Sequence, residues 1–130
     1  MSIRPNIDQF NALMAAPDEG PVVMLNLLKF KERAESGEST GGEAYRRYGD
    51  AAIEMIEERG GKVLSTGKAE QVLIGDPNED WDAVLLVQYP SRAAFVEMTS
   101  TKEYDAAHKH RENGLQRTIV IACEPRTEAL

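Results

Sequence analysis

Apolar residues recur along this chain in two patterns, one typical of β-strands and one typical of α-helices. Nearly continuous or alternating apolar runs, bounded by Gly, Pro, Asp and Asn, predict four strands, at residues 22–30, 62–75, 83–89 and 116–123. Apolar residues spaced three and four apart predict helices over residues 7–14, 43–59 and 91–114. After the first helix, the order of elements is therefore βαββαβ.

Capping signals mark where the predicted helices begin and end. Asn6 can cap the short first helix, which the segment 17–21, rich in Pro and Gly, then ends. Thr40 and Glu43 form a capping box for the second helix, and Gly60-Gly61 ends it. The third helical stretch starts after Pro90-Ser91 and restarts at residues 100–103, so we expect it to be interrupted there.

The polar connection between the first strand and the second helix, residues 31–42, is longer than most connections in small domains. It is rich in Glu, Ser and Gly. Two interpretations remain open, a mobile lid and a long structural loop.

The element order predicts an α+β protein with a ferredoxin-like fold, in which two helices cover one face of a four-stranded antiparallel sheet. We expect a short N-terminal helical extension (1–20), the ferredoxin-like domain (21–125) and a tail (126–130). Both faces of the sheet are predicted to be apolar, because successive side chains of a strand point to opposite faces and apolar residues occupy both sets of positions. In the third strand, Val84 and Leu86 point to one face and Ala83, Leu85 and Val87 to the other. In the fourth strand, Ile119 and Ile121 point to one face and Thr118, Val120 and Ala122 to the other. The helices can cover only one face. The other is expected to pack against a second copy, which predicts a homodimer through the open sheet face.

Composition narrows the possible partners. The chain of 130 residues has 15 Lys and Arg against 22 Asp and Glu, a net charge of −7, and no basic stripe, which argues against nucleic acid. Cys123 is the single cysteine, so no internal disulfide can form. The first residues lack the apolar run of a signal peptide, and no run is long enough to cross a membrane. We therefore expect a cytoplasmic protein with no membrane partner.

A set of short motifs, taken in order, is similar to the domain-of-unknown-function 1330 family: residues 23–30 (VMLNLLKF), 45–48 (YRRY), 60–62 (GGK), 81–82 (WD), 89–95 (YPSRAAF), Tyr104 and Arg111. The resemblance covers about residues 20–125. It implies the dimeric α/β-barrel superfamily, in which two ferredoxin-like sheets pair into one barrel. That superfamily includes cofactor-free monooxygenases, haem-degrading monooxygenases, lactone isomerases and proteins with no assigned activity.

The ligand space of such folds lies between sheet and helices, so polar residues on the inward faces are the candidate site residues. We expect His108 and Arg111 to be catalytic, His108 by moving a proton and Arg111 by binding a carboxylate or enolate. The candidate substrate-binding residues are Asn26, Tyr45, Tyr48, Arg92 and Tyr104. Asn26 needs hydrogen-bond partners, and the hydroxyls of Tyr45 and Tyr48 are candidates.

Each of these residues also has a structural interpretation. Asn26 could be satisfied by the backbone, the tyrosines could be core residues, and the residues on the last helix could form an ordinary polar surface. His108 and Glu112 share a helix face, but two ligands without a third make a poor metal site, and we expect neither metal nor cofactor.

Three functions are compatible with the sequence. The first is a cofactor-independent monooxygenase or isomerase acting on a small aromatic or enolisable metabolite. The second is a non-catalytic dimer that binds a small molecule or serves as an interaction module. The third is haem degradation, for which Asn26 and His108 match loosely, while the tryptophan that similar enzymes carry on the second helix is missing.

Overall fold

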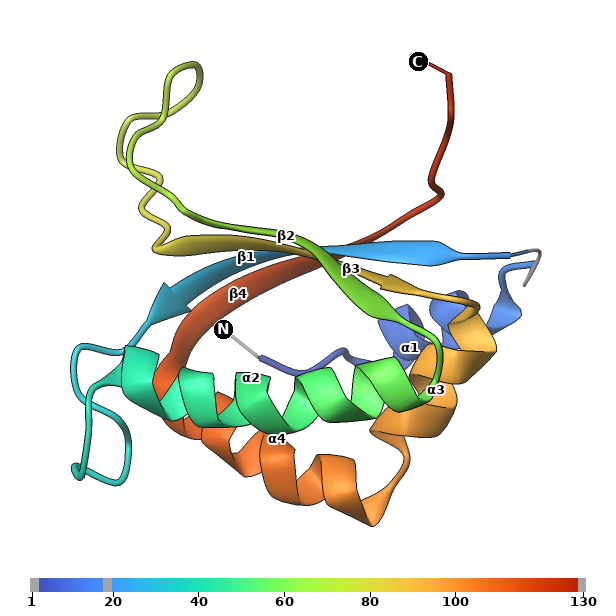
Figure 1. Ribbon diagram of the computed structural model, residues 1–130. Helices are drawn as coiled ribbons and strands as arrows, with labels where there is room; N and C mark the ends of the chain where they lie inside the picture. Colours follow the sequence, from blue (N-terminus) through green and yellow to red (C-terminus); the bar gives the residue numbers. More distant parts are fainter. Residues whose placement is uncertain (1–2, 18–19, 129–130) are drawn as a thin grey trace.

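A four-stranded antiparallel sheet forms one layer of the molecule and the helices form the other (Figure 1). The computed structural model describes residues 3–17 and 20–128. The strands pair in the order β2-β3-β1-β4. Their bounds are β1 Val22–Phe30, β2 Lys62–Lys68, β3 Ala83–Tyr89 and β4 Leu115–Cys123. This order and the antiparallel pairing confirm the predicted ferredoxin-like α+β fold.

The helices begin at the residues that the capping signals predicted. They are α1 Ile7–Ala15, α2 Gly41–Glu58, α3 Arg92–Thr99 and α4 Lys102–Gly114. Asn6 and Thr40 each form a capping box, with Gln9 and Glu43 respectively. Ser91 caps α3, and Thr101 caps α4, which confirms the predicted interruption of the third helical stretch. Asp18 and Glu19, part of the segment expected to end α1, lie outside the described residues.

The strand register confirms that both sheet faces are apolar. Met24 pairs with Val87 and Ala122, and the next residue, Leu25, pairs with Leu86 and Ile121 on the opposite face. The helix face holds the hydrophobic core, whose buried members are Val22, Met24, Ala52, Met55, Ile56, Val87, Tyr89, Met98 and Ala107. The other side of the sheet, here called the open face, carries Leu25, Leu27, Val84, Leu86, Ile119 and Ile121.

The second predicted strand is too long. β2 ends at Lys68, which pairs with Ala83 at the start of β3, and residues 69–82 form a loop. In this loop Leu73 and Ile74 are 84% and 92% exposed. Their apolar run resembles a strand in the sequence, but β3 has no residues left to pair with it. The register of β2 is irregular between Val63 and Ser65.

The long connection between β1 and α2 is fastened to the end of α4. The backbone N–H of Lys31 donates to the carbonyl of Gly114 at 2.8 Å, and that of Glu35 donates to the carbonyl of Asn113 at 2.9 Å. The Asn113 side chain also accepts from the N–H of Ser36 at 2.7 Å. These contacts favour a structural loop over a mobile lid.

Two glycines allow this junction to close. A Cβ atom at Gly114 would lie 2.3 Å from the carbonyl oxygen of Gly41, and one at Gly41 would lie 2.1 Å from the carbonyl oxygen of Lys31. Both distances are far shorter than van der Waals contact, so the start of α2 and the end of α4 can approach this closely only without side chains.

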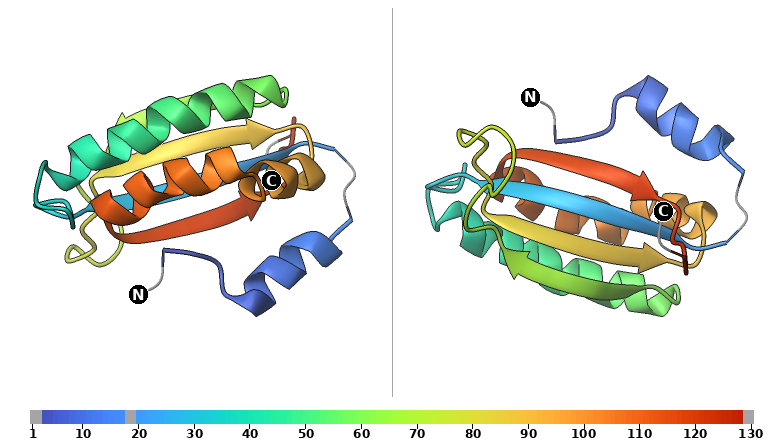
Figure 2. Two further views of the ribbon diagram at one scale, coloured as in Figure 1. Left: turned by 90° about the horizontal axis from the view of Figure 1, so that it is seen from below. Right: turned by 90° about the horizontal axis from the view of Figure 1, so that it is seen from above.

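The N-terminal segment and α1 lie along the β4 side of the helix layer (Figure 2). Arg111 on α4 donates to the carbonyl of Ile3 at 2.6 Å, and Arg4 pairs with Glu112 on α4 at 2.5 Å. Partly buried Leu13 joins α1 to the core. Within the described residues, every helix is too short or too polar to cross a membrane.

Candidate functional site

A cavity of about 1840 Å³ lies between the helix face of the sheet and the helices, and it is called the main cavity below. Its lining reaches both edges of the sheet, with Val63 and Thr66 on β2 and Thr118, Val120 and Ala122 on β4. All seven predicted site residues line it: Asn26, Tyr45, Tyr48, Arg92, Tyr104, His108 and Arg111. The structure therefore places these seven residues around one space.

A row of aromatic rings forms one wall of the main cavity. Phe30 and Tyr45 have ring centroids 5.5 Å apart, Tyr45 and Tyr48 5.3 Å, and Tyr48 and Tyr104 6.0 Å in an edge-to-face arrangement. Tyr45 and Tyr48 meet because they are three residues apart on α2. Such a wall offers flat apolar surface and phenol groups to an aromatic ligand.

The phenol groups of Tyr45 and Tyr48 stay protonated at neutral pH. Burial raises the pKa of Tyr45 to about 12, although the positive charge of Arg111 opposes the shift. Burial and the neighbouring Tyr104 raise the pKa of Tyr48 well above its usual value. The hydroxyls of Tyr48 and Tyr104 share a hydrogen bond of 3.0 Å. One of these two hydroxyls is the donor in that bond, so the other keeps its proton free to donate to a ligand oxygen.

His108 is the most unusual polar residue of the site. Only 6% of it is exposed, and within the part of the chain described here neither Nδ1 nor Nε2 has a hydrogen-bond partner. Its Nε2 lies 3.5 Å from the Glu112 carboxylate, too far for a good hydrogen bond. Burial, Arg4 and Arg111 lower the pKa of His108 to about 4, against weaker opposing effects of Glu112 and Asp105. The imidazole is therefore neutral at pH 7.

Arg111 lies one helical turn beyond His108 and is 7% exposed. Its Nη1 donates to the carbonyl of Ile3, and its guanidinium carbon lies 5.9 Å from the centroid of the Tyr48 ring. Within residues 3–17 and 20–128, no carboxylate forms an ion pair with it. A buried cation without an anion is costly unless another group compensates for the lost water.

Asn26 has different partners from those considered in the sequence. Its Nδ2 donates to the backbone carbonyls of Met24 at 3.1 Å and Leu85 at 3.4 Å, and not to the hydroxyl of Tyr45 or Tyr48. The structural interpretation of this residue, a side chain satisfied by the backbone, therefore fits the geometry. Arg92 lines the main cavity from the first turn of α3.

The N-terminal segment is the part of the site that sequence reasoning missed. Ile3, Arg4, Phe10 and Leu13 line the main cavity, although residues 1–20 were expected only to extend the domain. No local motif marks them. Their role depends on a contact between residues more than a hundred positions apart, Ile3 with Arg111, which no spacing rule could reveal.

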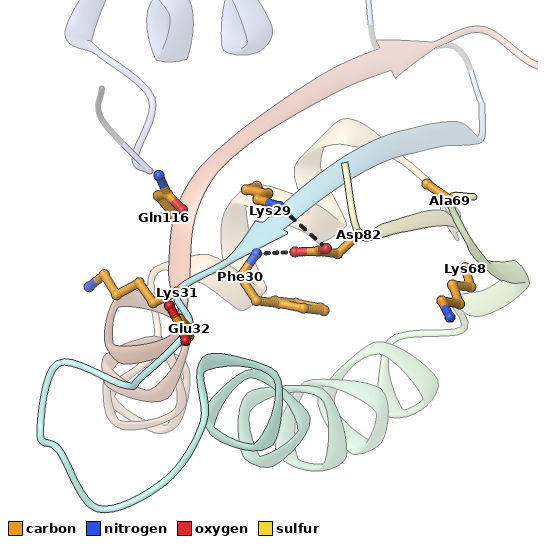
Figure 3. A pocket seen from close by; sticks show the side chains of 8 residues that line it. All are labelled: Lys29, Phe30, Lys31, Glu32, Lys68, Ala69, Asp82 and Gln116. Carbon is orange, nitrogen blue, oxygen red and sulfur yellow. Dashed lines mark hydrogen bonds and ion pairs between the residues drawn. The ribbon is translucent and has the colours of Figure 1, made fainter. Parts of the chain in front are cut away.

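A smaller cavity of about 600 Å³ lies at the end of β1, between Lys29, Lys31, Lys68 and Asp82 (Figure 3). Two of its lysines, Lys29 and Lys31, already form ion pairs. Lys29 contacts Asp80 at 2.7 Å and Asp82 at 3.5 Å, and Asp82 accepts from the backbone N–H of Phe30 at 2.8 Å. Lys31 pairs with Glu35. These contacts join β1 to the end of the 69–82 loop, so we assign them a structural role.

Metal binding finds no support in the side-chain arrangement. Among the described residues, no three His, Cys, Asp or Glu side chains gather closely enough to hold an ion. His108 and Glu112 lie together, as the helical spacing predicted, without a third ligand.

Comparison with solved structures confirms the fold. A protein of unknown function from Rhodopseudomonas palustris is 39% identical, with a TM-score of 0.90 over 97% of this chain and 98% of that one. A DABB family protein with a ferredoxin-like fold from Mesorhizobium loti is 14% identical, with a TM-score of 0.53 over 83% and 99%. A protein from Mycobacterium tuberculosis is 20% identical, with a TM-score of 0.53 over 86% and 100%.

Among curated proteins, none matches this chain. The model of one protein family matches residues 34–124, from the loop before α2 to the end of β4. The match does not include β1, whose residues 23–30 carry one of the motifs that resemble this family. With most of its length matched, the chain belongs to the family named domain of unknown function 1330 (DUF1330).

Proposed function

We propose that this protein binds a small aromatic or enolisable metabolite in the main cavity and that His108 moves a proton on it. One observation supports this most: a buried, neutral imidazole with both nitrogens unpartnered among the described residues, beside a row of tyrosines. Buried polar groups nearly always have hydrogen-bond partners, so an unpartnered one in a cavity indicates a place for a ligand atom.

The proposed chemistry is proton transfer next to a carbonyl group. His108 takes a proton from the carbon beside the carbonyl, and the negative charge moves to the carbonyl oxygen as an enolate. The hydroxyl of Tyr104, whose ring lies 5.6 Å from that of His108, can donate a hydrogen bond to this oxygen. In a substrate with a neighbouring C=C bond, return of the proton at the far carbon shifts that double bond and completes an isomerisation. If dioxygen reacts with the enolate first, the same step begins a cofactor-independent monooxygenation.

A non-catalytic binding protein is the second candidate, and one observation favours it. The pKa of His108 is lowered to about 4, which makes the imidazole a weak base. A neutral histidine of this kind can still accept or donate a hydrogen bond to a bound ligand. Binding and turnover must therefore be measured separately.

We also propose that the protein is a homodimer that pairs through the open face. Leu25, Leu27 and Leu86 on this face lie opposite the helix layer, so a single copy leaves them without a second layer. The 69–82 loop and residues 124–128, which follow β4, rise on this same side of the sheet (Figure 1). In the dimer, the exposed Leu73 and Ile74 of this loop would pack against apolar side chains of the second copy.

Binding can be tested with three small probes, phenylacetone, 3-phenylpropanoate and 3-phenylpropanamide, by ligand-observed NMR. We expect at least one to bind, and we expect Val120→Phe to abolish binding because this side chain points into the main cavity from β4. Ala106→Phe adds the same ring at an exposed position on α4 and should leave binding intact. Equal binding by both variants would place the ligand elsewhere.

Turnover is tested with the same ketone. In deuterium oxide, proton abstraction by His108 would exchange the hydrogens beside the carbonyl of phenylacetone, and His108→Gln would lose this exchange. Binding without exchange in the unmodified protein would favour the non-catalytic alternative.

A further inference from the structure

The positive charge of Arg111 has no matching negative charge in the described part of the chain. Glu112, the next residue, is bound by Arg4 at 2.5 Å, and Arg4 is the main reason why the pKa of its carboxyl group is lowered. Arg111 instead donates to a backbone carbonyl, that of Ile3, at 2.6 Å. A guanidinium group has five N–H donors in a planar fork that fits a carboxylate, whereas the partners present, the Ile3 carbonyl and the Tyr45 hydroxyl, carry no negative charge.

The imidazole of His108 lies near two guanidinium groups. Arg4 and Arg111 both disfavour its protonation, and Glu112 and Asp105 oppose them only in part. The ring of Tyr104 packs beside the imidazole, with ring centroids 5.6 Å apart. At this end of the main cavity, His108 and Arg111 lie on one face of α4 with Ile3 and Arg4 beside them, and the positive charges act on the imidazole more strongly than the negative ones.

We infer that the ligand of the main cavity carries an anionic group, a carboxylate in the simplest case, which binds the Arg111 guanidinium beside the N-terminal segment. This inference rests on the proposed function and specifies its ligand class. The carbonyl of Ile3 holds one donor of Arg111 and so fixes the orientation of the guanidinium fork. The aromatic row places the rest of the ligand alongside Tyr45 and Tyr48, with the reactive carbon towards His108.

Binding of an anion here has a direct consequence for His108. A negative charge at Arg111 offsets the positive charge that disfavours imidazole protonation, so the pKa of His108 should rise when the ligand binds. The ligand's own anionic group would thus strengthen the base that acts on it. A neutral ligand of the same shape would leave the base weak.

The test compares two probes of nearly the same shape, 3-phenylpropanoate and 3-phenylpropanamide. Their dissociation constants are measured by NMR titration of the full-length protein at pH 7. We expect the carboxylate to bind about tenfold more tightly than the amide, as a charge-assisted contact requires. In Arg111→Gln the preference for the carboxylate should disappear, so that the two affinities become equal. Arg111→Lys keeps the charge without the fork and should retain part of the preference.

The possible outcomes separate this inference from the proposed function. If the amide binds as tightly as the carboxylate in the unmodified protein, the inference is wrong and the proposed cavity ligand survives as a neutral molecule. If phenylacetone binds the main cavity but 3-phenylpropanoate does not, the inference is wrong and the proposed function survives. If none of the three probes binds there, the proposed function falls together with the inference. If the carboxylate preference persists unchanged in Arg111→Gln, the anion binds elsewhere and the inference is also wrong.

A second measurement avoids any change at Arg111, in case that variant does not fold. The ring protons of His108, assigned by comparison with His108→Gln, are titrated by NMR with and without each probe. We expect saturating 3-phenylpropanoate to raise the pKa of His108 and 3-phenylpropanamide to leave it near 4. An equal or absent shift with both probes contradicts the inference.

Discussion

The hydroxyl groups of Tyr48 and Tyr104 share a hydrogen bond of 3.0 Å that joins α2 to α4 at one wall of the main cavity. Their rings meet edge to face with centroids 6.0 Å apart. Tyr48 packs against the hydrophobic core, and so does Tyr104. This pair therefore connects the packing of the helices with the polar lining of the proposed ligand site.

Because the two hydroxyls satisfy each other, their removal should not be additive. Tyr48→Phe and Tyr104→Phe each keep the ring contact but leave the partner hydroxyl unpaired, at a cost of about 1 kcal/mol of unfolding free energy each. In the double variant no hydroxyl is left unpaired. We expect its cost to fall below the sum of the single costs by about 0.5 kcal/mol or more, measured by urea denaturation. Strictly additive costs would show that the hydrogen bond does not stabilise the fold.

Stability should fall in acid because of His108. Its pKa is about 4 in the folded protein against 6.5 in the unfolded chain, so the unfolded state takes up a proton first as the pH falls. The free energy of unfolding should therefore decrease between about pH 6.5 and pH 4, by on the order of 3 kcal/mol from this group, and then level off. Above pH 6.5 this group contributes no slope.

The control for this effect is on the same helix. His108→Gln should lose this part of the pH dependence, whereas His110→Gln, two residues along α4, should keep it. The test is to measure the free energy of unfolding of the unmodified protein and of both variants at pH 7 and pH 4.5. If both variants show the same pH dependence as the unmodified protein, His108 is not the group responsible.

The close approach of α2 and α4 predicts opposite effects for two Gly→Ala substitutions. Gly114→Ala would place a Cβ atom 2.3 Å from the carbonyl of Gly41, and we expect it to destabilise the protein by about 2 kcal/mol or more. Gly49→Ala, inside α2 and with no heavy atom within 4 Å of the new Cβ, should stabilise it by up to about 1 kcal/mol. Thermal and urea unfolding test both. A harmless Gly114→Ala would mean that the junction can relax.

The proposed dimer can be tested with two neighbouring residues of β4. Val120 and Ile121 are 44% and 50% exposed, but Val120 lies on the helix face and Ile121 on the open face. In sedimentation experiments, we expect Ile121→Glu to convert the dimer into a 14.4 kDa monomer and Val120→Glu to leave it dimeric. A monomeric unmodified protein at micromolar concentration, or a dimer that survives Ile121→Glu, contradicts pairing through this face.

Much of the fold follows from local features of the sequence. Asn6, Thr40, Ser91 and Thr101 each cap the helix that the pattern predicted, because a capping residue acts only on the turn that follows it. The alternation of residues along each strand also predicted correctly which side chains lie on which face of the sheet, because successive side chains of a strand point to opposite sides. The error over residues 69–75 has the same origin, because an apolar run becomes a strand only if a neighbouring strand can pair with it.

The candidate site, like the fold, was predictable from the sequence only in part. Helical spacing determined that Tyr104, His108 and Arg111 share one side of α4, and the βαββαβ order determined that this side faces the sheet. Only the tertiary structure decided what these side chains contact: the unpartnered imidazole of His108, the hydroxyl pair of Tyr48 and Tyr104, and the carbonyl of Ile3 on Arg111. The reason is physical, since periodicity fixes the direction of a side chain within its own element, whereas its partners depend on how distant segments pack together.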